Sequence, residues 1–160
     1  MNYFEVKVRY TRPNVNGKLF DTVSELYLVN AFTFGMAEQR VLDHVKGYAF
    51  PDSAIEVIAM KIVSYDTVKT SPYDQVYGTT FFRAKVILTI IDDQGKEKKQ
   101  PLYILVYESD IENATGAVRS EMSEGYGCCE WNIDTIQETK VLEVLDTVTV
   151  TFHTSNETEE

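Results

Sequence analysis

Residues 3–10 read Tyr-Phe-Glu-Val-Lys-Val-Arg-Tyr, a stretch in which apolar and charged side chains alternate. Successive side chains of a β-strand point to opposite faces, so Phe4 and Val8 share one face while Lys7 and Arg9 share the other. This pattern predicts a strand that buries one face and exposes the other. It also opens a longer unit, because turn residues, a second strand and a helix follow it.

The unit of two strands, a helix and a strand is predicted twice. In the first half we expect strands at 3–10 and 22–31, a helix at 34–46 and a strand at 54–65. In the second half we expect strands at 80–91 and 100–108, a helix at 111–123 and a strand at 130–145, either continuous or with a break. The repeats therefore cover about 2–65 and 80–145 of a single domain at 1–153, with a polar linker at 66–79. Residues 147–153 are expected to add a short edge strand, and residues 154–160 a polar acidic tail that is disordered.

Residues of the two halves match at a nearly constant offset. The offset is 78 for Lys7 with Lys85 and for Gly17-Lys18 with Gly95-Lys96, and 77 for Thr33 with Asp110. We expect it to return to 78 in the third strands, where Ile55 and Ile58 would match Ile133 and Ile136. A unit of this length is too long for a solenoid repeat. The alternative is that any two such units share a similar apolar pattern.

The duplication predicts an α+β fold of two ββαβ units. Its antiparallel-rich sheet would carry both helices on one face and leave the other face open to solvent or to a partner. Four segments, at 3–10, 27–31, 82–86 and 138–144, resemble segments of known sequences in their order and spacing. Through them the chain resembles a family of short uncharacterised proteins, a domain of unknown function from gut bacteria and their phages or mobile elements. The resemblance supports the fold and a bacterial or phage cytoplasm, and it implies no activity.

Composition narrows the classes of partner. The formal net charge is −10, from 25 acidic and 15 basic residues, so the chain as a whole repels a phosphate backbone. No signal peptide and no membrane span is expected from the apolar pattern. Cys128 and Cys129 are the only cysteines and are adjacent, which gives no disulfide framework and predicts a reducing cytoplasm.

The sharpest candidate site is a basic strip of Lys7, Arg9, Arg83 and Lys85 on the helix-free face. The aromatic side chains of neighbouring strands that we expect to join it are Tyr27, Tyr103 and Tyr107. Guanidinium groups beside aromatic rings suit a nucleotide, another small anion or a single-stranded nucleic acid. The alternative is a solvated face whose basic residues pair across strands with acids such as Glu5 and Glu25.

Other residues give weaker signals. Cys128-Cys129 lacks a nearby cation to activate a thiol, and we expect small buried residues at the start of a strand there. His44 has no second histidine near it in sequence to suggest a metal site or a catalytic triad. We therefore expect a protein that is not an enzyme, with no cofactor, no metal and no membrane partner. Its predicted role is that of a binding or adaptor protein that engages a protein partner, or a second copy of itself, through the open sheet face or a sheet edge.

Overall fold

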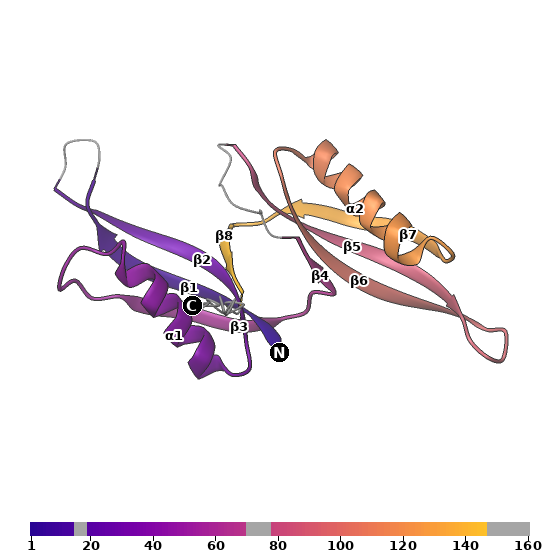
Figure 1. The fold of residues 1–160 in the computed structure, drawn as a ribbon, viewed down its shortest axis with the longest axis horizontal. Coiled ribbons are helices and arrows are strands. Elements are labelled where there is room, and N and C mark those ends of the chain that lie inside the picture. The colour runs from indigo at the N-terminus through magenta and orange to yellow at the C-terminus, as the bar shows by residue number, and fades with distance from the viewer. Residues whose placement is uncertain (15–18, 70–77, 147–160) are drawn as a thin grey trace, which may run out of the picture.

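A computed structural model describes residues 1–14, 19–69 and 78–146. The α+β class is confirmed: two helices accompany two four-stranded mixed sheets, which lie side by side with one helix each (Figure 1). We expected one sheet bearing both helices, so this part of the predicted arrangement differs. The expected edge strand at 147–153 and the tail at 154–160 lie outside the described residues. Neither described helix is long and apolar enough to cross a membrane.

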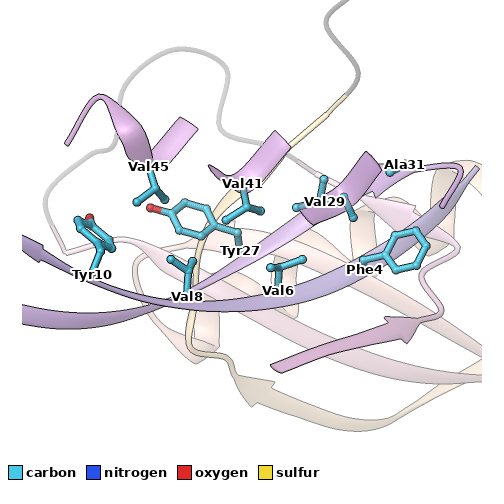
Figure 2. Packing of buried hydrophobic residues seen from close by; sticks show 10 residues of the cluster. Phe4, Val6, Val8, Tyr10, Tyr27, Val29, Ala31, Val41 and Val45 are labelled. Carbon is cyan, nitrogen blue, oxygen red and sulfur yellow. The ribbon is translucent and has the colours of Figure 1, made fainter. Parts of the chain in front are cut away.

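The first sheet has the order β3-β1-β2-β8 and carries α1. Its elements are β1 (Asn2–Arg12), β2 (Asp21–Ala31), α1 (Phe34–Lys46), β3 (Glu56–Val63) and β8 (Val141–Leu145). The helix begins where predicted because the Thr33 hydroxyl accepts a hydrogen bond from the Met36 amide at 3.2 Å, which satisfies one free donor of the first turn. Ala37, Val41 and Val45 then pack on the alternating apolar residues of β1 and β2. Figure 2 shows this packing for Val41 and Val45.

The second sheet has the order β4-β6-β5-β7 and carries α2. Its elements are β4 (Thr67–Val68), β5 (Thr80–Ile91), β6 (Glu97–Glu108), α2 (Ile111–Tyr126) and β7 (Glu130–Glu138). Asp110 caps α2 as Thr33 caps α1, by accepting from the Asn113 amide at 2.8 Å. The segment predicted as a strand at 130–145, continuous or with a break, is broken after Glu138. Its second part, β8, lies in the other sheet, which we did not expect.

Each half gives its last strand to the sheet of the other half. β4, which lies in the segment predicted to be a linker, pairs in parallel with β6 through Thr67–Ile104 and Val68–Leu105. β8 pairs in parallel with β2 at the equivalent place in the first sheet, so that Val144 lies opposite Leu28. Neither four-stranded sheet is therefore complete without the other half of the chain.

The strand registers give a stricter comparison of the halves than the sequence alone. Both first strands carry a register shift at the same position, between Lys7 and Val8 in β1 and between Lys85 and Val86 in β5. Through these pairings Val57 corresponds to Ile133 and Met60 to Ile136, an offset of 76. The predicted match of Ile55 and Ile58 with Ile133 and Ile136 is therefore wrong by two residues. The connection between helix and strand is shorter in the second half, at residues 127–129 against 47–55, and this outweighs the greater length of α2, which has 16 residues against 13 in α1.

A third core joins the two sheets. Leu28, Phe81, Leu105 and Val141 are at most 4% exposed and form one cluster that neither helix enters. Tyr3, Val68, Tyr107 and Val144 pack around it. We expected the helix-free face of the sheet to be open. The helix-free faces of the two sheets instead cover each other in part.

We predict that this arrangement makes the halves unfold together. Val29→Ala removes two methyl groups from the first core, and it should lower the free energy of unfolding by about 2 kcal/mol. The only tryptophan, Trp131, lies in the second half and reports on that half by fluorescence. In Val29→Ala, the urea midpoint measured by Trp131 fluorescence should fall by as much as the midpoint measured by far-ultraviolet circular dichroism. Leu19→Ala is the control, since Leu19 is 86% exposed. A Trp131 midpoint unchanged by Val29→Ala would contradict the coupling.

Candidate ligand-binding site

The basic residues singled out in the sequence lie on two separate sheets. Arg9 Nη2 lies 2.8 Å from Glu56 Oε2, and Lys85 Nζ lies 3.6 Å from Asp134 Oδ2. Lys7 lines a cleft of about 390 Å³ together with Lys140. The two ion pairs across neighbouring strands agree with the alternative of a solvated face. They differ in detail from the pairs expected there, because Glu5 binds Lys61 at 3.2 Å.

The tyrosines expected beside the strip are divided between the two faces. Arg83 lies over the Tyr103 ring, 4.5 Å from its centroid, and 5.7 Å from that of Tyr65. Tyr107 packs instead on Phe81 in the third core. Tyr27 is 2% exposed and belongs to the helix-covered face, so its expected place on the helix-free face is wrong. Tyr27 and Leu28 are both buried because this part of β2 has a covered surface on each side.

Tyr27 belongs to a polar cluster that the sequence analysis missed. A cleft of about 450 Å³ opens between one end of the β1–β2 hairpin, the last turn of α1 and β8. We call it the tyrosine cleft, and its lining residues are Tyr10, Arg12, Pro13, Glu25, Tyr27, His44, Tyr48, Leu142 and Glu143. Figure 2 shows Tyr10 and Tyr27 at one end of the first core, with the Tyr27 hydroxyl directed toward Tyr10.

Glu25 organises the inner wall of the cleft. Its Oε1 accepts a hydrogen bond from the Tyr10 hydroxyl and another, at 3.4 Å, from the Tyr27 hydroxyl. Burial, the hydrogen bond to Glu25 and the charge of Glu25 together raise the pKa of Tyr10 to about 12. Burial followed by the charge of Glu25 raises the pKa of Tyr27 as well. Both phenols are therefore neutral hydrogen-bond donors at physiological pH.

His44 forms the second wall, from the last turn of α1. Its Nε2 lies 2.9 Å from Glu143 Oε2, within ion-pair distance, yet this buried nitrogen makes no hydrogen bond within the described residues. The ring packs at centroid distances of 5.3 Å from Tyr27 and 5.4 Å from Tyr48. The cleft thus brings together two carboxylates, a histidine and three phenol rings.

The second half of the chain provides an internal comparison for this cluster. The strand registers place Leu88, Leu102 and Ile104 where the first half has Tyr10, Glu25 and Tyr27. All three counterparts are apolar and at most 4% exposed. The same arrangement of strands and helix is therefore built without a polar cluster, so the fold does not require one. The signal in the sequence was the placing of Glu25 and Tyr27 two residues apart, where the other half has two apolar residues.

Two further features can be placed. Cys128 and Cys129 are both exposed with their sulfur atoms 3.7 Å apart, so the expectation that they are buried is wrong. They lie in the short turn between α2 and β7, where no layer covers them. Within the described residues, no group of three or more His, Cys, Asp or Glu side chains is arranged to hold a metal ion.

We predict that the tyrosine cleft makes stability sensitive to alkaline pH. A phenol whose pKa is higher in the folded protein than the ordinary 10.0 contributes stability below pH 10, and this is lost as the pH rises toward 12. The free energy of unfolding from urea titrations should therefore fall over this window, and it should fall less steeply in Tyr10→Phe. Tyr48→Phe, which removes an exposed phenol, is the matched control. Equal slopes in Tyr10→Phe and the unmodified protein would contradict the assignment.

The comparisons with known proteins agree with the extent of the fold. No curated protein matches the chain. A family model matches residues 2–147, which include every strand and helix described above. The chain therefore belongs to the family described as Domain of unknown function (DUF4494).

Proposed function

We propose that the protein is a non-enzymatic binding protein, and that the tyrosine cleft binds a small ligand that carries a positively charged nitrogen. The observation that carries this proposal is the contrast between the halves. Tyr10, Glu25 and Tyr27 occupy positions that the second half fills with apolar side chains. Polar groups that a fold does not need, gathered at a cleft, are typical of a binding site.

The charges of the cleft favour a cation. Glu25 and Glu143 supply two carboxylates, while the phenols of Tyr10 and Tyr27 stay neutral. Arg12 adds one positive charge, but it is exposed and its guanidinium lies beside the Tyr10 hydroxyl. The two carboxylates therefore outnumber it in the lining of the cleft. A carboxylate provides a charge-assisted hydrogen bond to an ammonium group, and it does so more strongly than a neutral acceptor.

The aromatic residues favour the same class of ligand. The rings of Tyr27, His44 and Tyr48 form a row whose outer member, Tyr48, is 58% exposed. A cation over the face of a phenol ring is attracted by the negative charge density of that face. The volume of about 450 Å³ lies in the range of small-molecule sites, which is roughly 300–1,000 Å³.

The other expectations stay proposals of lesser weight. Binding of a nucleotide, a small anion or a single-stranded nucleic acid to Lys7, Arg9, Arg83 and Lys85 has less support, since acids pair with Arg9 and Lys85. A role in the cytoplasm of a gut bacterium, or of a phage or mobile element within it, is supported by the family resemblance. It is also supported by the free thiols of Cys128 and Cys129.

The proposal is tested by calorimetric titration with a panel of small primary and quaternary amines, set against neutral and anionic compounds of matched size. We expect amines to bind, and Glu25→Gln and Glu143→Gln to weaken binding about tenfold or more, because each removes one carboxylate charge. Asp134→Asn is the matched control, since it removes an exposed carboxylate far from the cleft in the other sheet.

Three results would count against the proposal. Preferential binding of the anionic members would reverse the assigned charge of the ligand. Unchanged affinity in both glutamate variants would move the site away from the cleft. Turnover of a bound amine that is lost in Glu25→Gln would replace the binding role by an enzymatic one.

A further inference from the structure

The outer edge of β3 differs from the equivalent edge of the other sheet. β3 and β7 occupy matching edge positions, next to β1 and β5. The registers place Ile58 of β3 where β7 has Asp134, and Ile62 where β7 has Glu138. Ile58 is 39% exposed and Ile62 is 53% exposed. Charged residues on an edge strand discourage pairing with another strand. At these two positions β3 therefore lacks the protection that Asp134 and Glu138 give to β7.

The polar residues of β3 are complementary to a second copy of themselves. Glu56 and Lys61 both point to the helix-free face, where they pair with Arg9 and Glu5 of β1. Their side chains are still 59% and 69% exposed. If two β3 strands run antiparallel with Glu56 of one copy opposite Lys61 of the other, two oppositely charged pairs form across the new seam.

The same register also aligns the apolar residues. It sets Val57 opposite Met60, and both side chains pack on the helix-covered side of the first sheet. Ile58 is the extra residue of a bulge, because Val57 and Ala59 pair with consecutive residues of β1. Both copies carry this extra residue, so the Ile58 of each copy lies opposite the Ala59 of the other. The two bulges therefore match, and the distance between the two strands stays constant along the seam. Ile62 then lies opposite Ile55, the residue that directly precedes β3.

We propose that the protein forms a homodimer in which the β3 strands of two copies pair antiparallel and join two first sheets into one continuous sheet. Among residues 1–14, 19–69 and 78–146 no strand pairs with this edge of β3. The occupant is a second copy because one register satisfies charge, apolar faces and bulge spacing together. This inference is independent of the tyrosine cleft, which lies at β8 on the opposite edge of the same sheet.

Sedimentation velocity over a range of concentrations tests the proposal. The unmodified protein should show a concentration-dependent dimer. Ile62→Glu should weaken it about tenfold or more, because the two-fold axis places the new carboxylate at the seam twice. Glutamate is the residue that the second half has at this position, so the fold should tolerate it. Ile91→Glu is the matched control, since Ile91 is 68% exposed at the end of β5 in the other sheet.

A pair of charge variants tests the register. Glu56→Lys alone and Lys61→Glu alone each place like charges opposite each other and should be monomeric. Mixed together, they should restore the dimer as a heterodimer. One copy then carries lysine at both positions and the other carries glutamate at both, so each of the two contacts across the seam joins opposite charges.

A monomer at every concentration would overturn the proposal, whatever other molecule binds the edge. A dimer that Ile62→Glu leaves intact would place the interface elsewhere. Failure of the mixed charge variants to associate would exclude this register.

Discussion

The exchange of strands β4 and β8 is the constraint on which the rest of the structure depends. Each is short, two and five residues, and each lies beside a strand of the opposite half. Short strands add few hydrogen bonds by themselves, so they stabilise the structure mainly through the apolar surface that is buried around them. Val141 of β8 packs with Leu28, Phe81 and Leu105 in the third core, and Val68 of β4 packs against it. The sheets are thereby held in one arrangement without a third layer between them.

Much of the local structure follows from short-range signals in the sequence. The helix at 34–46 and the strand at 80–91 have the predicted bounds, because side-chain caps and alternation act within a few residues. The exchange could not be predicted in this way. Thr67-Val68 stands in a polar segment, and only its contact with Ile104 and Leu105 makes it a strand. Tyr27 was misplaced for a related reason, since alternation carries no information where both faces of a strand are buried.

The two halves serve as controls for each other. A feature that both share, such as the capped helix or the register shift before Val8 and Val86, belongs to the architecture. A feature present in only one half is not required by the architecture, so it is a better guide to function. The Tyr10–Glu25–Tyr27 cluster and the apolar edge at Ile58 and Ile62 both belong to the first half. The second half has apolar core residues in place of the former and two acids in place of the latter.

The position of β8 also fixes when the tyrosine cleft comes into being during synthesis. Most of its wall comes from residues 10–48, but Leu142 and Glu143 arrive from the last described strand. The nascent chain can form the first hairpin and helix early, while the place beside β2 stays empty until the second half has left the ribosome. The cleft is therefore completed only after β8 has been synthesised, and a chain interrupted before β8 has the first hairpin but no finished site.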